Sequence, residues 1–215
     1  MIRLAWTTPV EWVARVEQDP LALLSDHAHC EMKAAASAQA LIGKNTRKSE
    51  LVRALCDIAR EELEHFGRVQ QALVARGGVL EPFSRNPYAE TLIGRSGQGR
   101  VCTDDERNET LLDRLLVSAL IEARSLERFV LLAEHARDEE LAVLYRSLVP
   151  SEAAHQAQFQ KLARAAYPER RVQERLEFLT QLEASVVAAL PFEVRMHSGM
   201  NVTADTLHAA GNPAM

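Results

Sequence analysis

The stretch Glu62-Leu63-Glu64-His65 places a carboxylate and an imidazole three residues apart, and Glu152-Ala153-Ala154-His155 repeats the pattern in the second half of the chain. Residues at i and i+3 of a helix lie on one face, so each pair can hold a common ligand. Both stretches lie inside long segments of helical periodicity. The sequence therefore predicts a helical protein in which two helices present the same pair of side chains.

Each of these helices is preceded by another long helical segment that carries one glutamate on an otherwise apolar face. Glu31 has Ala28 and Ala35 on its face, and Glu122 has Leu115 and Phe129. The separation of Glu31 from Glu62 is nearly that of Glu122 from Glu152. We infer that one helix pair, carrying a lone glutamate and an E-x-x-H motif, occurs twice.

Helix start and stop signals divide the rest of the chain. We expect helices over about 9–17, 20–42, 48–76, 103–137, 138–166 and 169–190, with a kink at Pro150. Prolines and glycines between about 79 and 102 predict a long crossover loop without regular structure. We expect one domain over residues 1–199 and a polar, irregular tail over 200–215.

Four long helices with short, long and short connections indicate a four-helix bundle, to which a short N-terminal helix and a fifth, C-terminal helix are added. The fold class expected is thus all-α. Aromatic residues make up only 5% of the 215 residues, which disfavours β architectures.

Composition excludes several classes of protein. The formal net charge of −5 excludes a polycation that coats nucleic acid, although it permits a local basic patch. Charged residues interrupt each apolar stretch before it could cross a membrane. The dispersed cysteines Cys30, Cys56 and Cys102 indicate reduced thiols. We therefore expect a cytoplasmic protein without a membrane contact.

Four carboxylates and two imidazoles that face the inside of one bundle form a ligand set for two divalent metal ions. Oxygen and imidazole ligands favour iron or manganese over copper and zinc. Burying the carboxylates without cations would cost several kcal/mol each. The predicted metal ligands are Glu31, Glu62, His65, Glu122, Glu152 and His155.

Several neighbours of these ligands allow two interpretations. Glu61 either contacts the site from outside the ligand set or is exposed, and exposure is the simpler expectation. His27 and His29 are either hydrogen-bond partners of the site or, as the safer assumption, satisfied elsewhere or exposed. Arg124 either offsets negative charge near the site or, by default, lies on a solvated helix face. The small residues 34–38 predict either a void beside the metals or close helix packing.

The chain resembles the ferritin-like, non-haem di-iron monooxygenases that hydroxylate the isopentenyl group of 2-methylthio-isopentenyladenosine beside the anticodon of tRNA. The resemblance extends from about Trp6 to Gly199. It is carried by Asp26-His27-Ala28-His29-Cys30-Glu31-Met32-Lys33-Ala34-Ala35, Arg60-Glu61-Glu62-Leu63-Glu64-His65-Phe66, Glu122-Ala123-Arg124-Ser125-Leu126-Glu127-Arg128-Phe129, Ser151-Glu152-Ala153-Ala154-His155 and Arg195-Met196-His197-Ser198-Gly199.

This resemblance implies that the six ligands bind two iron ions (Fe2+/Fe3+), that O2 is the co-substrate and that the anticodon loop of tRNA carries the substrate. The sequence contains no flavin or nicotinamide motif, so an external electron donor, a reductase or ferredoxin, is implied. We expect a monomer. The alternatives are a ferroxidase or iron-handling protein that assembles into a cage, a manganese catalase, and a metal-free helical scaffold.

Two groups of basic residues could contact tRNA phosphates. One lies at the first turn between long helices: Lys44, Arg47, Lys48 and Arg53. The other lies in or beside the crossover: Arg76, Arg85, Arg95, Arg100 and Arg107. We expect the two groups at opposite ends of the bundle, so that only one of them contacts the RNA, and acidic neighbours dilute the second.

Overall fold

The computed structural model describes residues 1–82, 85–98 and 106–201, with side chains from Thr110 onward in the last range. It contains the helices α1 (Glu11–Val16), α2 (Pro20–Lys44), α3 (Ser49–Ala75), α4 (Pro87–Arg95), α5 (Glu106–His135), α6 (Glu139–Ala166) and α7 (Glu169–Ala189). Outside these helices, an isolated bridge joins Pro191 to Asn201. The all-α prediction is confirmed.

The helix starts follow from local chemistry. The Asp19 side chain accepts a hydrogen bond from the Ala22 amide at 3.0 Å, and Pro20 is the first residue of α2. Asp138 caps α6 in the same way through the Leu141 amide, at 3.1 Å. Each cap satisfies an amide that has no partner within its helix. These starts agree with the sequence prediction, and α6 continues through Pro150.

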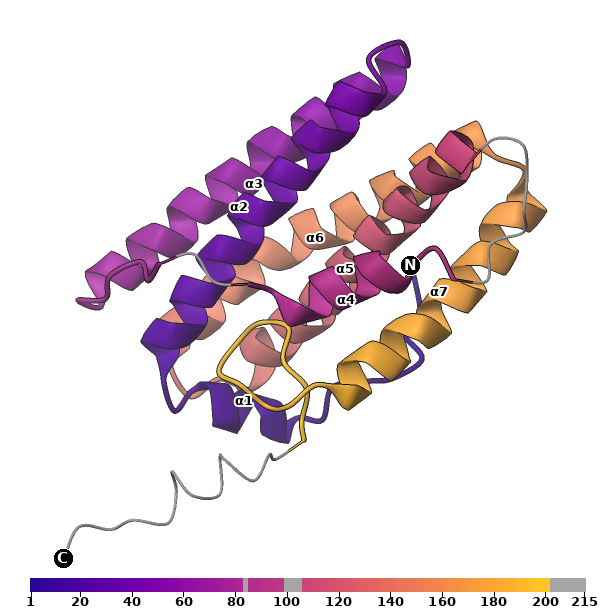
Figure 1. Ribbon diagram of the computed structural model, residues 1–215. Coiled ribbons are helices and arrows are strands. Elements are labelled where there is room, and N and C mark those ends of the chain that lie inside the picture. Colours follow the sequence, from indigo (N-terminus) through magenta and orange to yellow (C-terminus); the bar gives the residue numbers. More distant parts are fainter. Residues whose placement is uncertain (83–84, 99–105, 202–215) are drawn as a thin grey trace, which may run out of the picture.

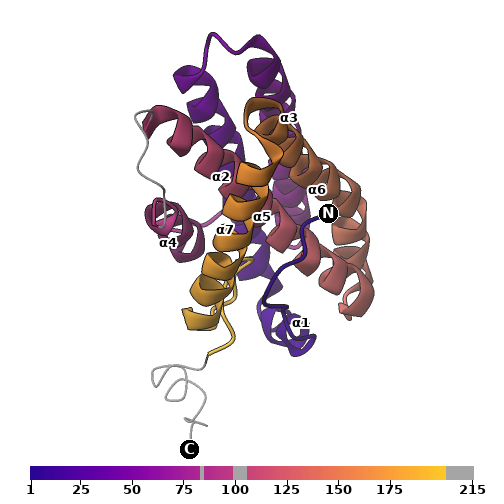
Figure 2. The ribbon, with the colours of Figure 1, turned by 90° about the vertical axis from the view of Figure 1, so that its right-hand side faces the viewer.

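Two long helix pairs form the bundle. Helix α2 lies along α3, and α5 lies along α6, as Figure 1 shows. Helix α7 packs against α5 and α4, and α1 lies at one end, beside α5. The view in Figure 2 shows α7 on the side of α5 away from the first pair. Four long helices with an added N-terminal and an added C-terminal helix are the architecture that the sequence predicts.

The predicted loop over 79–102 is partly wrong, because α4 forms inside it. Asn86 caps this helix by accepting from the Ala89 amide at 3.1 Å, and Pro87 is its first residue. Tyr88 and Leu92 are completely buried. The Asn-Pro pair that marks a turn is equally a helix start, and the buried aromatic face decides between the two. Arg100, Cys102, Thr103 and the tail 202–215 lie outside the described residues.

The segment that follows α7 folds back into the bundle. Met196, His197 and Ser198 are buried, and Arg128 donates hydrogen bonds to the carbonyl oxygens of Met196 and Ser198. A Cβ atom on Gly199 would overlap the carbonyl oxygen of Leu190, so only glycine permits this close approach. The segment forms no helix, but it is part of the packed structure.

The core consists of two apolar clusters, one toward each end of the bundle. One includes Leu55 and Leu115, and the other includes Val69 and Phe129. The predicted metal ligands occupy the helix turns between them, so a polar layer crosses the middle of the protein. No described helix is long and apolar enough to cross a membrane.

Candidate metal centre

The structure brings the six predicted ligands together. Glu31 comes from α2, Glu62 and His65 from α3, Glu122 from α5, and Glu152 and His155 from α6. All six side chains are buried, with exposed fractions of 6% or less. Because the two E-x-x-H helices and the two single-glutamate helices each face the axis, every ligand reaches the same layer.

The first group of donors surrounds His65. Its Nδ1 atom lies 3.8 Å from Glu31 Oε2, 3.7 Å from Glu62 Oε2 and 3.6 Å from Glu152 Oε1. Four donor atoms, one from each of these residues, lie within 4.8 Å of one another. This cluster can therefore surround a single ion.

The second group surrounds His155. Its Nδ1 atom lies 2.9 Å from Glu62 Oε1, and donor atoms of Glu62, Glu122 and His155 again lie within 4.8 Å of one another. Glu62 belongs to both groups, and it turns one oxygen toward His65 and the other toward His155. A carboxylate in this position can bridge two ions.

Unsatisfied buried atoms test whether the donor set fits metal ions. Both Glu62 oxygens, Glu152 Oε1 and the Nδ1 atoms of His65 and His155 are buried without a hydrogen-bond partner. Buried polar atoms are normally paired, and each orphan costs about 1–3 kcal/mol. Two divalent cations would coordinate all of these atoms and compensate the carboxylate charges. The residues present therefore fit a di-metal site.

The electrostatics of the carboxylates lead to the same conclusion. Burial, followed by the charge of Glu62, raises the pKa of Glu122 to about 8. Burial also raises the pKa of Glu62 and of Glu152, and neighbouring carboxylates reinforce both shifts. Without cations the layer holds more negative charge than its surroundings stabilise, so protons occupy the positions that metal ions would take.

Burial has the opposite effect on the pKa of the two imidazoles, because it disfavours their protonated form. Burial alone would lower the pKa of His65, but the nearby carboxylates of Glu31 and Glu62 raise it to about 9. The pKa of His155 is also raised to about 9, against the effect of burial, by Glu62 and Glu122. A metal ion must displace these protons, so its binding is expected to strengthen as the pH rises.

Two further residues contact the ligands. His27 Nε2 lies 2.5 Å from Glu31 Oε1 and is fully buried beside the rings of Phe129 and Tyr145. This contact lowers the pKa of Glu31 well below its usual value although burial opposes it. His27 is thus a hydrogen-bond partner of the site, which is the first of the two interpretations of its sequence position. His29 is instead bonded to the Glu81 carbonyl oxygen, at 2.8 Å.

Glu61 also contacts the site, contrary to the simpler expectation of exposure. One of its oxygens lies 2.9 Å from His155 Nε2, and its side chain is 40% exposed. A carboxylate at this nitrogen fixes the ring orientation and leaves Nδ1 for the metal. The sequence does not separate Glu61 from Glu64, because the contact arises only when α6 packs against α3.

The expectation that Arg124 lies on a solvated face is wrong. Arg124 is fully buried and forms a two-pronged pair with Glu183 of α7, with both distances at 2.9 Å. Arg128 is equally buried, and burial together with Arg124 lowers its pKa to about 9. These arginines connect α5 to α7 and to the C-terminal segment and do not contact the ligands.

A cavity of about 240 Å3 lies against the metal layer. Four of the ligands line it, together with the small residues Ala34, Ser37 and Ala38 of α2. The void predicted beside the metals is therefore present. Three further lining residues, which sequence periodicity does not indicate, are Asn86, Ser125 and His197. The His197 ring connects them, because Ser125 Oγ lies 3.1 Å from His197 Nε2 and Asn86 Nδ2 lies 3.5 Å from His197 Nδ1.

Known proteins are similar to this chain over nearly its whole length. Residues 2–198 match the family described as tRNA-(MS[2]IO[6]A)-hydroxylase (MiaE). The chain belongs to this hydroxylase family. A tRNA 2-(methylsulfanyl)-N(6)-isopentenyladenosine(37) hydroxylase of Pseudomonas putida (strain KT2440) is 37% identical over 197 residues, with 92% of each chain covered.

Two further proteins are similar to this member of the hydroxylase family. The Salmonella typhimurium (strain LT2) protein of the same name is 28% identical, over 90% of this chain and 86% of its own. Among solved structures, Protein 43 with aldehyde deformylating oxygenase activity from Synechococcus superposes with a TM-score of 0.83. It is 40% identical, and the match covers 94% of this chain and 99% of that one. These likenesses confirm an oxygenase of ferritin-like fold.

Proposed function

We propose that the protein is a di-iron monooxygenase that uses O2 to hydroxylate the isopentenyl group of 2-methylthio-isopentenyladenosine next to the anticodon of tRNA. The observation that carries the proposal is the buried set of four glutamates and two histidines, open on one side to a cavity. The named activity of the hydroxylase relatives supplies the substrate.

In this proposal two iron ions would be held by Glu31, Glu62, His65, Glu122, Glu152 and His155, of which Glu62 belongs to both donor groups. Bound iron supplies the two-electron chemistry by which O2 oxidises a C–H bond. Glu61 orients His155, and His27 orients Glu31. The apolar clusters above and below the layer exclude water from it.

The cavity is suited to an apolar substituent. Its walls include Ala34, Ala89, Ile93 and Phe159 between the polar ligands. Pockets that enclose a drug-sized molecule usually measure about 300–1,000 Å3. At about 240 Å3 this cavity suits a short branched chain, while the rest of the nucleoside stays outside it.

The proposal implies further partners. The electrons come from an external reductase or ferredoxin, and the protein acts on tRNA as a monomer. A cytoplasmic location stays a prediction.

The test is nucleoside analysis of prenylated tRNA that has been incubated with O2 and the reduced, iron-loaded protein. We expect a nucleoside that has gained one oxygen atom. Glu122→Ala and His155→Ala should abolish both iron loading and product, because each removes a ligand. Glu64→Ala is the matched control, since Glu64 lies on the exposed face of α3. Full activity in either ligand variant would contradict the assignment of the site.

The Synechococcus structure favours one second candidate, deformylation of an aldehyde at the same centre. Incubation with a long-chain aldehyde and the same reductant decides between the two. Hydrocarbon product, with tRNA left unmodified, would replace hydroxylation as the function. A large cage assembly that oxidises Fe(II) would instead indicate a ferroxidase.

A further inference from the structure

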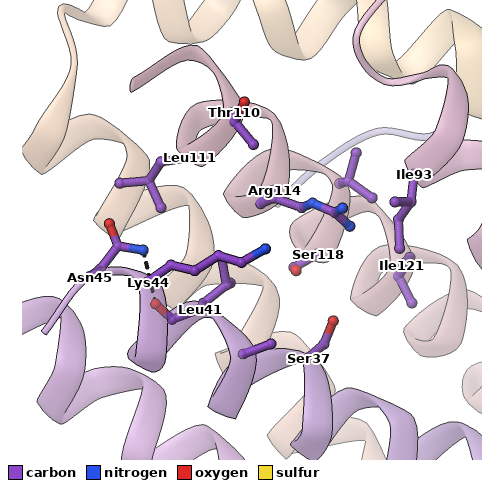
Figure 3. A pocket seen from close by; sticks show the side chains of 12 residues that line it. Ser37, Leu41, Lys44, Asn45, Ile93, Thr110, Leu111, Arg114, Ser118 and Ile121 are labelled. Atoms are coloured by element: carbon purple, nitrogen blue, oxygen red, sulfur yellow. Dashed lines mark hydrogen bonds between the residues drawn. The ribbon is translucent and has the colours of Figure 1, made fainter. Parts of the chain in front are cut away.

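A second cavity, of about 540 Å3, opens where α2 ends and α5 begins. Its walls come from three helices: Leu41 and Lys44 from α2, Ile93 from α4, and Arg114 and Val117 from α5. Figure 3 shows Lys44 and Arg114 extending into the same space, with Ser118 and Ser37 beside them. We call this cavity the outer pocket, and the one at the metal layer the inner cavity.

The two cavities are adjacent. Both are lined by Ser37, Ile93, Ser118 and Ile121. Ser37 and Ser118 are small, so only short side chains separate the outer pocket from the inner cavity, which Glu31 and Glu122 line. A group that enters at the α2 terminus can therefore reach the metal layer along one passage.

The mouth of this passage carries two cations. Lys44 is exposed and Arg114 is half-buried, and within the part of the chain that the structure describes neither forms an ion pair. Two arginines of the crossover group are neutralised by contrast: Arg76 pairs with Asp138 and Glu140, and Arg85 pairs with Glu90. In a chain of net charge −5, two unpaired cations at one pocket mark a site for an anion.

This placement revises the expectation that the two basic groups lie at opposite ends. Arg76 does lie at the far end, beside the start of α6. The crossover, however, returns to the end of α2, because Ile93 of α4 lines the same pocket as Lys44. Arg114, which sequence reasoning did not single out, completes the pair.

We propose that the outer pocket binds the modified nucleotide of tRNA, with Lys44 and Arg114 holding the phosphates that flank it. The base and ribose occupy the outer pocket, and the isopentenyl group passes Ser37 and Ser118 into the inner cavity. This inference rests on the proposed hydroxylation and assigns the RNA contacts of the same site.

The dimensions agree with this division. The outer pocket falls within the range of about 300–1,000 Å3 that encloses a drug-sized ligand, whereas the inner cavity falls below it. Arg114 precedes Glu122 on α5 by two helical turns, which is about 12 Å at 1.5 Å per residue. An isopentenyl group alone is too short to span this separation, so a whole nucleotide is needed to contact both ends.

The test compares Lys44→Ala, Arg114→Ala and the double variant with wild type on two substrates, prenylated tRNA and the free prenylated nucleoside. Arg170→Ala is the control, because it removes an equal charge from an exposed position on α7. We expect the KM for tRNA to rise about tenfold per cation, with kcat unchanged, because charge-assisted contacts to phosphate are lost. The KM for the free nucleoside, which has no phosphate, should change much less than the KM for tRNA.

Direct binding of prenylated tRNA gives an answer that does not depend on turnover. The slope of log affinity against log salt should become shallower by about 0.7–1 for each cation removed. Circular dichroism and iron content establish that each variant is folded and loaded. If the double variant binds tRNA with wild-type affinity and salt slope, the inference is wrong, whether or not the protein hydroxylates tRNA.

Ser37→Leu tests the passage separately. Ser37 is exposed on α2, so leucine can be accommodated without disturbing the core. We expect kcat to fall several-fold on both substrates while tRNA affinity is retained. If the wild-type protein forms no hydroxylated product, the proposed function is wrong. If the wild type is active and Ser37→Leu has an unaltered kcat, only the passage is wrong.

Discussion

The two helix pairs of the bundle carry the same ligands in different surroundings. The α2–α3 pair has its outer side toward solvent, while α5 is covered by α7 and the N-terminal segment (Figures 1 and 2). Arg124 and Arg128 anchor that cover from the α5 side. The lone glutamates differ as well: Glu31 has a histidine partner, whereas Glu122 lies among other carboxylates.

The histidines show a second asymmetry. His155 of α6 is held by Glu61 of α3 at 2.9 Å. The residue that corresponds to Glu61 on α6 is Ser151, and its hydroxyl donates to the Leu148 carbonyl oxygen of its own helix. The repeated spacing thus specifies where the candidate ligands lie, while unrelated neighbours decide how firmly each one is oriented.

The largest effect is expected where the two halves meet, at Glu62. Glu62→Ala removes the only carboxylate common to both donor groups in the described structure, so both ions should be lost. Metal analysis after anaerobic reconstitution should return close to none, and turnover should vanish. Retention of one full equivalent would show that one helix pair can bind metal without the bridge.

The next largest effect concerns the pH dependence of the metal-free protein. The pKa of Glu122 is raised to about 8, and those of His65 and His155 to about 9. Their stabilising protonated forms are complete below pH 4.5 for the glutamate and 6.5 for the histidines, and are lost as the pH rises through the folded values. Chemical denaturation should therefore show stability falling from about pH 4.5, where Glu122 begins to contribute, to about pH 9, where the histidines lose their protons.

Glutamine variants of the lone glutamates separate the halves in the same experiment. In Glu122→Gln, stability should fall less steeply with rising pH up to about pH 8, because the variant has no carboxyl group to titrate at this position. Glu31→Gln should instead lower stability near neutral pH, because the pKa of Glu31 is lowered and its carboxylate is stabilised there by His27. Identical profiles for the two variants would contradict the asymmetry.

A third prediction addresses the cover over α5. Glu183→Ala leaves Arg124 buried without its two-pronged partner and also removes the acceptor of the Tyr88 hydroxyl. Removing one partner of a buried pair typically lowers stability by about 3–5 kcal/mol. Denaturant unfolding should report a loss of this size, while Glu174→Ala, in the exposed pair with Arg170, should change little. An equal loss in both variants would remove the distinction between buried and exposed pairs.

Much of this structure follows from local sequence. Caps such as Asp19 and Asp138 and the repeated E-x-x-H spacing suffice to predict the long helices and all six candidate ligands. Helix α4 is missed because its nine residues offer too little periodicity between prolines and glycines. Its stability comes from burying Tyr88 and Leu92 against distant helices, which no local pattern contains.

The same reason explains the misplaced arginines. Arg124 carries a charge in a helix of mixed composition, and local rules assign such residues to solvent. Its burial depends on Glu183, which lies far away in the sequence and reaches it only once α7 is packed. Likewise Glu61 and Glu64 look alike on α3, and only the approach of α6 gives Glu61 its histidine.

The smallest effect should come from the residues that orient ligands. Glu61→Ala and His27→Ala each leave the six ligands intact but free one of them, and loss of such partners typically weakens metal affinity by about 10–100-fold. Competition with a chelator should show the loss at one ion in each case. Glu61→Ala should affect the ion at Glu62, Glu122 and His155, and His27→Ala the ion at Glu31 and His65. Glu61→Gln, which can still accept a hydrogen bond, should recover part of the affinity. If both variants weaken the two ions equally, the halves act as one unit and the difference in their surroundings has no bearing on metal binding.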